Sequence, residues 1–319
     1  MQSNFGSLQK TDGPMKILVT GANGFIGTHL CQELSNRKID FRATARNGNE
    51  NHYADFFSCD LETTKSLDQL MEGCEIVVHL AGRAHVTGDD SAEKYHIANE
   101  VVTQRISSAA VRNEVARFVY LSSIKVNGES SNSNQPISHT NNPSPLDNYG
   151  RSKLDAEVSL QSICRASNMN FVIIRPTLVY GKGVKANFSA LISAVRKGLP
   201  LPIASVHNSR SMIGINNLID LIVNTCTNPK AANQTFLASD GNDISTPALV
   251  RLIAKSLNRP ARIFPFPTSI LRLLASIIGR SSAIDKLTGS LSVDISHTMN
   301  SLNWQPPFST ESEIVKAVS

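Results

Sequence analysis

The segment KILVTGANGFIG, residues 16–27, constrains the fold of this 319-residue chain more than any other stretch. An apolar run, 16–20, is followed by glycines at positions 21, 24 and 27, and residues 25–37 have helical spacing. Glycines let the backbone turn tightly and approach a pyrophosphate, whose charge then lies at the helix N-terminus. A strand–helix turn that binds no ligand would also use glycines. The glycine segment of this chain, however, stands at the start of a β-α-β pattern, which favours a dinucleotide site.

Short apolar strands and helical segments alternate through the first half of the chain. After the first strand, further strands are expected at 41–45, 75–80, 118–121 and 171–174. Helical spacing is found at 25–37, 95–113 and 149–166. Short buried strands that alternate with helices form parallel sheets covered on both faces. The pattern therefore predicts an α/β fold with a doubly wound, Rossmann-type sheet.

The second half is less regular and predicts a smaller, substrate-binding α/β lobe. Its helices are expected near 187–197, 216–227, 246–257 and 268–278. We expect a disordered leader over 1–14, a dinucleotide-binding domain over 15–180 and the lobe over 181–319, with strands free to cross the boundary. Residues 127–148 are rich in Ser, Asn and Pro, and a loop of this length is more often a functional lid than a filler.

Composition argues against several classes of protein. The net charge is +5 and no dense Lys/Arg run with interleaved aromatics is present, which argues against nucleic acid as a partner. The five cysteines have no Cys-x-x-Cys spacing, as expected for reduced thiols in a cytoplasmic protein without a metal site. No apolar stretch is long enough for a membrane span. The most apolar run, 270–279, is interpreted by default as core, with an interface or a membrane-surface contact left open.

The end of the second strand discriminates between NAD and NADP. A carboxylate there binds the adenosine ribose hydroxyls, whereas an arginine accommodates a 2′-phosphate. The strand ends at Ala45 and Arg46 follows, while the nearest acid, Asp40, lies at the strand entrance. Arg46 therefore favours NADP(H) over NAD(H), unless it is a solvated loop residue. Asp60, after the strand-like FFSC, is placed to accept from an adenine amino group.

Tyr149 and Lys153 lie four residues apart, on one face of an expected helix. A phenol with a pKa of about 10 is a poor base at neutral pH, and a nearby ammonium lowers that pKa. Such a pair is common on solvated helices, but here Ser123 ends a buried strand on the side of the sheet where ligands bind. Its hydroxyl can bind the substrate oxygen that Tyr149 protonates or deprotonates. His79, by contrast, is interpreted as a packed strand histidine.

These motifs together resemble the extended short-chain dehydrogenases/reductases of the NAD-dependent nucleotide-sugar epimerase/dehydratase family. The resemblance covers residues 15–306 and is carried by TGANGFIG, CDL, HLAG, FVYLSSIKVNGE, YGRSK and RPTLVYG. It implies Ser123, Tyr149 and Lys153 as catalytic residues and a homodimer formed through helices around 95–113 and 149–166. With Arg46 added, the expected cofactor site comprises Gly21, Gly24, Phe25, Ile26, Gly27, Arg46, Asp60, Leu61, Ala81, Gly82, Asn99, Tyr149, Lys153 and Pro176.

The family binds a nucleoside diphosphate sugar with its C-terminal lobe. By the same resemblance, Asn187 in GVKANF and Arg210 in RSMIGINN contact the pyrophosphate and nucleotide of a UDP-sugar, while Ser123 and Tyr149 contact the sugar. Arginine suits this task because its planar fork matches phosphate oxygens. The structural alternatives are a helix N-cap for Asn187 and a surface position for Arg210.

Two departures from the family pattern bear on the reaction. Asn127 replaces a tyrosine typical of 4-epimerases, and Ala45 followed by Arg46 replaces the acid of NAD-retaining epimerases. Both favour a 4-ketoreductase that converts UDP-4-keto-6-deoxy-N-acetylglucosamine to UDP-N-acetylquinovosamine for bacterial surface polysaccharide (O-antigen). The alternatives are a UDP-glucose or UDP-N-acetylglucosamine 4-epimerase with tightly bound NAD, and a non-catalytic dinucleotide sensor. A 4,6-dehydratase is disfavoured because Ile124 and Lys125 stand where elimination needs an acidic pair.

Overall fold

The computed structural model describes residues 15–48, 51–84, 91–131, 135–184, 187–277 and 281–319. The expected leader over 1–14 lies outside these ranges. The chain forms two compact units. Unit 1 comprises residues up to 126 together with 145–175 and 222–236, and unit 2 comprises 127–144, 176–221 and 237–319. Within the described ranges, no helix has both the length and the apolar character needed to cross a bilayer.

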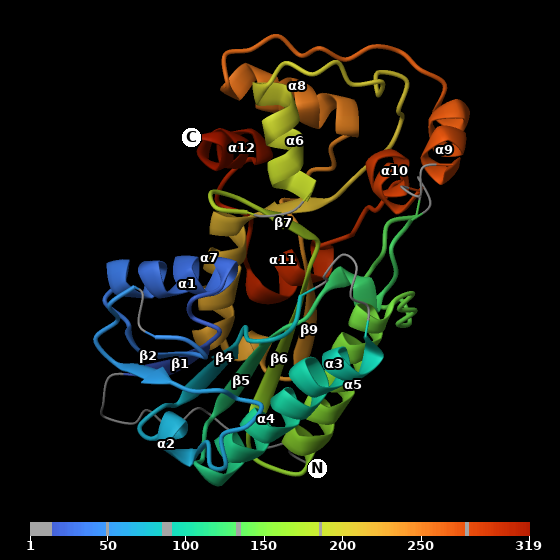
Figure 1. Cartoon of the computed structure of the whole chain (residues 1–319). Helices are drawn as coiled ribbons and strands as arrows, with labels where there is room; N and C mark the ends of the chain where they lie inside the picture. The colour runs from blue at the N-terminus through green and yellow to red at the C-terminus, as the bar shows by residue number, and fades with distance from the viewer. Residues whose placement is uncertain (1–14, 49–50, 85–90, 132–134, 185–186, 278–280) are drawn as a thin grey trace. The chain divides into compact units, whose positions relative to one another are not determined.

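A seven-stranded sheet has the order β3-β2-β1-β4-β5-β6-β9 (Figure 1). Its strands are β1 (Lys16–Thr20), β2 (Asp40–Ala45), β3 (Phe56–Ser58), β4 (Ile76–His79), β5 (Arg117–Leu121), β6 (Asn170–Pro176) and β9 (Gln234–Ala238). The pairings from β3 to β6 are parallel. The chain winds away from β1 in both directions, so the ends of β1 and β4 form the switch point where such sheets bind ligands. The predicted doubly wound α/β fold is confirmed.

The helices of unit 1 include one π-helical segment. They are α1 (Phe25–Asn36), α2 (Asp68–Met71), α3 (Ala92–Tyr95), α4 (Val102–Arg112) and α5 (Asn148–Arg165), with short 3-10 turns at Ile124–Val126 and Pro229–Ala231. The single helix predicted over 95–113 is interrupted, because His96–Val101 between α3 and α4 forms a π-helix. Such π-turns are frequent at functional sites, and this one carries Asn99.

Alternation along the strands divides the core of unit 1 into two layers. Leu18, Val77, Phe118 and Ile173 belong to one hydrophobic cluster with side chains of α4 and α5, which lie side by side (Figure 1). Ile17, the strand neighbour of Leu18, is also fully buried and points to the opposite face. Burial on both faces explains why the strands are continuous apolar runs in the sequence.

Unit 2 contains a short parallel pair of strands and a set of helices. The strands are β7 (Leu178–Tyr180) and β8 (Met212–Gly214). The helices are α6 (Asn187–Arg196), α8 (Thr246–Ser256), α9 (Thr268–Ile277), α10 (Ser281–Thr288), α11 (Ser296–Leu302) and α12 (Thr310–Val318). The division between the units passes through α7 (Ile215–Thr227). Side chains of α6, α8 and α12 form the hydrophobic cluster of this unit.

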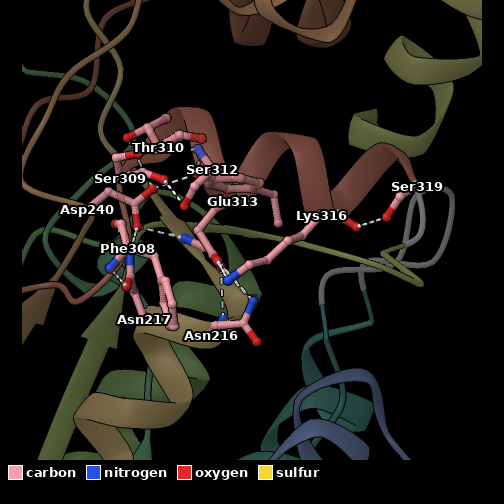
Figure 2. Close-up of polar contacts among 12 residues, drawn as sticks. Asn216, Asn217, Asp240, Phe308, Ser309, Thr310, Ser312, Glu313, Lys316 and Ser319 are labelled. Carbon is pink, nitrogen blue, oxygen red and sulfur yellow. Dashed lines mark hydrogen bonds and ion pairs between the residues drawn. The ribbon is translucent and has the colours of Figure 1, made fainter. Parts of the chain in front are cut away.

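A buried aspartate joins β8, α7 and the start of α12 in unit 2 (Figure 2). Asp240 accepts hydrogen bonds from the backbone N of Gly214 and from Nδ2 of Asn217, both at 2.8 Å. Asn217 also donates to the backbone O of Phe308 at 2.8 Å and accepts from its backbone N at 2.9 Å. Each buried polar group in this set therefore has a hydrogen-bond partner, which avoids the free-energy cost of burying an unpaired polar group.

A second buried acid fixes α12 directly (Figure 2). Glu313 accepts hydrogen bonds from the backbone N of Asn216 at 3.1 Å and from its Nδ2 at 2.9 Å. Lys316, one turn further along α12, pairs with Glu313 at 3.1 Å. A side chain at Gly214 would overlap the carboxylate of Glu313, so the approach of α12 to β8 requires glycine there.

The loop predicted after β5 is present at 127–131 and 135–144, and unit 2 holds it through backbone pairing. Ile137 donates from its N to the O of Ser292 at 2.8 Å, and its O accepts from the N of Asp294 at 2.8 Å. The rings of His139 and His297 stack with centroids 3.9 Å apart. The described part of the loop is therefore held to residues 292–294 by backbone hydrogen bonds. Its role as a lid stays a prediction.

Candidate active site

The glycine turn after β1 forms a cradle that side chains would fill. Gly21 has φ +70°, and a Cβ there would lie 2.8 Å from the N of Ala81 after β4. A Cβ at Gly27 would overlap the O of Gly21, so the helix start packs directly on the turn. The N-cap, Gly24, contributes no side-chain hydrogen bond, which leaves the first N–H groups of α1 for a ligand. The cradle fits the pyrophosphate of a dinucleotide.

Thr20 ties the two turns of the switch point together. Its Oγ1 accepts hydrogen bonds from the backbone N of Leu80 and of Ala81, each at 3.2 Å. The hydroxyl also shares a hydrogen bond of 2.7 Å with Nδ1 of His79. His79 is fully buried, and burial lowers its pKa to about 3. The histidine is thus a packed strand residue, as predicted, and it fixes the turn that Ala81 opens.

Asn99 connects the turn after β4 to α5. Its Oδ1 accepts from the backbone N of Arg83 at 2.7 Å, and its Nδ2 donates to the O of Arg83 at 3.2 Å and to Oγ of Ser152 at 2.9 Å. Ser152 in turn donates to the backbone O of Tyr149 at 2.8 Å. A Cβ at Gly82 would lie 2.7 Å from Oδ1 of Asn99, so this turn too has room only for backbone.

Ser123 and Tyr149 are brought together as the sequence predicts. Ser123 follows β5, and its hydroxyl donates a hydrogen bond to the hydroxyl of Tyr149. Tyr149 lies in the first turn of α5, whose N-cap, Asp147, accepts from the backbone N of Gly150 at 2.7 Å. The Tyr149 ring packs against that of Tyr95, with centroids 5.8 Å apart. Both hydroxyls therefore have a defined direction.

Lys153 is buried one turn after Tyr149, with 6% of its surface exposed. Its Nζ donates to the backbone O of Leu121 at 3.0 Å and lies 4.7 Å from the ring centroid of Tyr120. Burial lowers the pKa of Lys153 to about 8, and the negative charge of Glu157 opposes that shift. The ammonium is thus held at the end of β5 in an apolar environment.

The pKa of Tyr149 departs from the sequence-based expectation. An ammonium four residues away is expected to lower it, yet the pKa is raised to about 12. Burial is the largest cause, and the hydrogen bond from Ser123 only partly offsets it. The Lys153 ammonium donates to the backbone O of Leu121, and its charge is not among the causes of the shift. The prediction of a lowered pKa is therefore wrong for this state of the chain, and a further positive charge is needed to make Tyr149 a base.

Arg46 and Asp60 lie together beside an acid that the sequence analysis did not single out. The Arg46 side chain, 64% exposed, donates from Nη2 to Oε1 of Glu62 at 3.0 Å, and its Nε lies 3.8 Å from Oδ1 of Asp60. Oδ1 of Asp60 also accepts from the backbone N of Glu62 at 3.0 Å. The guanidinium after β2 thus has two carboxylates around it.

The remaining predicted cofactor residues occupy varied positions. Phe25 and Ile26 are the first residues of α1 and are half-buried, whereas Leu61 is buried in the core cluster of unit 1. Pro176 ends β6, is buried and belongs to unit 2.

Of the four predicted substrate residues, Ser123 and Tyr149 lie in unit 1, whereas Asn187 and Arg210 lie in unit 2. Asn187 is the first residue of α6, and its side chain lies outside the described part. Arg210 is half-buried and donates from Nη1 to the O of Gly289 at 3.1 Å. Burial lowers its pKa, and Glu129 opposes this. Asn127 is buried and donates to the O of Asn141 at 3.3 Å.

We find no candidate metal site among the described residues. Those residues include no group of three or more His, Cys, Asp or Glu that could hold a metal ion. All five cysteines are buried and free of disulfides.

Comparison with known proteins assigns the family. The profile of the NAD dependent epimerase/dehydratase family matches residues 17–238, which is more than half of the chain. The chain belongs to this family. It is 43% identical over 301 residues to a UDP-glucose 4-epimerase of Vibrio cholerae, covering 92% of each chain.

Two further relatives are more distant. An N-acetyl-alpha-D-glucosaminyl-diphospho-ditrans,octacis-undecaprenol 4-epimerase of Escherichia coli O157:H7 is 26% identical over 282 residues, covering 85% of this chain and 83% of the relative. The structure of a UDP-glucuronic acid 4-epimerase from Bacillus cereus, in complex with UDP-glucuronic acid and NAD, aligns with a TM-score of 0.78 at 22% identity. That alignment covers 95% of this chain and 98% of the other, and it shows a shared fold.

Proposed function

We propose that the chain catalyses hydride transfer at C4 of a UDP-sugar, with Tyr149 exchanging the proton on O4. The observation that carries the proposal is the arrangement at α5. The hydroxyls of Ser123 and Tyr149 are hydrogen-bonded, and Lys153 is buried one turn further along the same helix. Both curated relatives are 4-epimerases by name, which supports C4 as the reacting carbon.

Three side chains carry the proton chemistry in this proposal. Tyr149 takes the proton from O4 when C4 is oxidised and returns it when C4 is reduced. Ser123 donates a hydrogen bond to the same oxygen. When bound, a nicotinamide dinucleotide accepts or returns the hydride. Lys153 keeps a positive charge near the phenol, and the carbonyl of Leu121 holds it there.

We propose that the dinucleotide lies across the switch point. The backbone of Gly21, Gly24 and Gly27 and the first N–H groups of α1 hold the pyrophosphate. Ala81 and Gly82 leave room for the chain of the dinucleotide, and Asn99 fixes that turn. The other contacts that we propose for the dinucleotide are Phe25, Ile26, Asp60, Leu61 and Pro176.

The surroundings of Arg46 favour NAD and, with it, a 4-epimerase. Glu62 and Asp60 already offset the charge of the guanidinium, so a 2′-phosphate placed there would meet two carboxylates. An epimerase that retains NAD needs no such phosphate site, and the 43% identical relative is a UDP-glucose 4-epimerase. In this reaction Tyr149 acts twice per turnover. It takes the proton from O4 when C4 is oxidised, and it returns a proton when C4 is reduced from the opposite face of the sugar.

A 4-ketoreductase acting on UDP-4-keto-6-deoxy-N-acetylglucosamine is the second candidate. Arg46 still stands directly after β2, and most of its side chain is exposed. Displacement of the Glu62 contact would open a cationic site for NADPH. Asn127, where 4-epimerases typically carry a tyrosine, also favours this reaction.

We propose Arg210 and Asn187 as contacts of the UDP moiety. Arg210 is partly desolvated, which strengthens its interaction with an anion. Replacement of Arg210 by Lys should raise KM for the UDP-sugar by about tenfold and leave kcat within about twofold, since a point charge replaces the planar fork.

The purified chain should be incubated with UDP-glucose and with UDP-N-acetylglucosamine without added cofactor, and the products separated by chromatography. The 4-epimerase proposal predicts the C4 epimer of one of these sugars. Oxidation of NADH or NADPH by the 4-keto sugar, with no epimer formed, would establish the reductase instead. Absence of both activities in a chain that binds the dinucleotide would overturn the enzymatic proposal and favour the sensor.

We also propose a homodimer formed through the helices around 95–113 and 149–166. Ile97 in the π-helix and Val158 on α5 are 37% and 57% exposed, and a dimer interface would cover this apolar surface. Light scattering of the wild type and of Val158→Glu should show a dimer and a monomer, respectively.

A further inference from the structure

The helix α9 of unit 2 has an exposed apolar face. Ile270, Leu273 and Ile277 are 46%, 60% and 73% exposed. Their spacing of three and four residues places them on one side of the helix. The default interpretation of residues 270–279 as core is therefore wrong for these three positions, and residues 278–279 lie outside the described ranges.

The segment that leads into α9 also exposes apolar side chains. Phe264 is 41% exposed, and the prolines on either side of Phe266 are also exposed. Backbone pairing holds this segment in place, because Phe264 donates from its N to the O of Leu201 at 3.0 Å, and Leu201 donates to the O of Arg262 at 2.8 Å. The helix α9 packs against α10 (Figure 1). We define Phe264, Ile270, Leu273 and Ile277 as the α9 patch.

The sequence around the α9 patch is strongly basic. Residues 246–288 contain seven Lys or Arg residues and one acid, a net charge of +6, whereas the whole chain has +5 and the rest of it therefore −1. Of the seven basic residues, those in the part of the chain that the structure describes are Arg251, Lys255, Arg259, Arg262, Arg272 and Lys286, of which Lys255 pairs with Glu311 at 2.9 Å. Arg259 and Arg262 are exposed beside Phe264, and Arg272 lies on α9 itself, 3.8 Å from Asp285.

We propose that the α9 patch and its basic surroundings dock on the surface of an anionic phospholipid bilayer. Exposed Ile, Leu and Phe side chains would enter the boundary between headgroups and acyl chains, while the arginines contact lipid phosphates. A second copy of the chain suits the surface poorly, because a two-fold interface would bring one +6 segment against another. The docking does not depend on which reaction unit 1 catalyses.

The test is co-sedimentation of the full chain with vesicles of equal parts phosphatidylglycerol and phosphatidylcholine, and with vesicles of phosphatidylcholine alone. We expect binding to the anionic vesicles only, weakened by high salt. Replacing Ile270, Leu273 and Ile277 together by Gln should weaken binding by about tenfold or more. The matched control is Val315→Gln, an exposed apolar residue on α12, which should bind like the wild type.

Charge is tested separately from apolar contact. The double variant Arg259→Glu/Arg262→Glu should abolish binding, whereas Lys65→Glu/Lys230→Glu, with the same change in net charge at exposed positions elsewhere, should retain it. Thermal unfolding of each variant should match the wild type, since all these side chains are exposed. Equal binding to both vesicle types, or no binding to either, would overturn the proposal. It would also be overturned if the triple Gln variant bound vesicles like the wild type but had a different oligomeric mass.

Discussion

Glu157 lies one helical turn after Lys153 on α5, and the two buried side chains carry opposite charge. The Glu157 carboxylate accepts from Nε of Arg175 at 3.0 Å and from the hydroxyl of Ser122. It is also the charge that limits the lowering of the pKa of Lys153 by burial. Glu157 therefore acts on the candidate site through Lys153, as a positioning residue.

Replacing Glu157 by Gln should lower the pKa of Lys153 further below about 8. A lowered lysine pKa means that the ammonium is lost as pH rises, so the alkaline decline of kcat/KM should move to lower pH. Breaking the buried pair with Arg175 should also cost about 3 kcal/mol of stability. The control is Glu33→Gln, which removes an exposed helical pair. An unchanged pH profile in a folded Glu157→Gln variant would refute the coupling.

Replacing Tyr149 by Phe should lower kcat by about a hundredfold to ten-thousandfold, because general acid–base catalysis is lost. The melting temperature and the affinity for the dinucleotide should change little, since the ring keeps its packing on Tyr95. Both are measured on the same preparation. Undiminished biological function of this variant would favour the dinucleotide sensor over the enzyme.

Replacing Thr20 by Val removes the oxygen that joins Leu80, Ala81 and His79. Two backbone N–H groups lose their acceptor, which should cost about 1–3 kcal/mol in denaturant unfolding. Affinity for NAD should fall as well, because the turn that opens at Ala81 is released. Thr20→Ser keeps the oxygen and serves as the control. If Val and Ser variants bind NAD equally, Thr20 does not organise the turn.

Replacing Glu62 by Gln should strengthen binding of NADP by about tenfold and leave that of NAD nearly unchanged. The expectation follows from the pair between Arg46 and Glu62, which holds the guanidinium away from an incoming phosphate. Calorimetry with both dinucleotides measures the two affinities. The variant Arg46→Ala should keep the wild-type preference for NAD. A wild type that prefers NADP would contradict the epimerase proposal.

Local sequence patterns are enough to predict the frame of unit 1. The glycine turn, the apolar strands and the Tyr149–Lys153 spacing depend on neighbours along the chain, and the structure has them where they are expected. The strand runs were recognisable because both faces of the sheet are buried. The strands β7, β8 and β9 and the helices α2, α10, α11 and α12 were not predicted. Most of these elements are short, and a few residues carry too little periodicity.

Properties set by distant contacts could not be predicted. The pairing of Arg46 with Glu62 joins residues from different strand ends, so the sequence around Arg46 does not reveal it. The raised pKa of Tyr149 arises from tertiary burial. Thr20 and Glu157 did leave a signal, a polar residue ending an apolar strand and an acid four residues after Lys153, but both patterns are common.

The contacts of Glu313 and Phe308 with Asn216 and Asn217 have a consequence for biosynthesis. Residues 214–217 and Asp240 lack these partners until the segment 308–318 has been translated (Figure 2). A nascent chain can build the βαβ turns of unit 1 early, but unit 2 can close only after residues 308–318 have been made and have left the ribosome. Chains released without residues 308–319 should therefore expose unit 2 to protease and to chaperones, whereas chains that contain them should resist both.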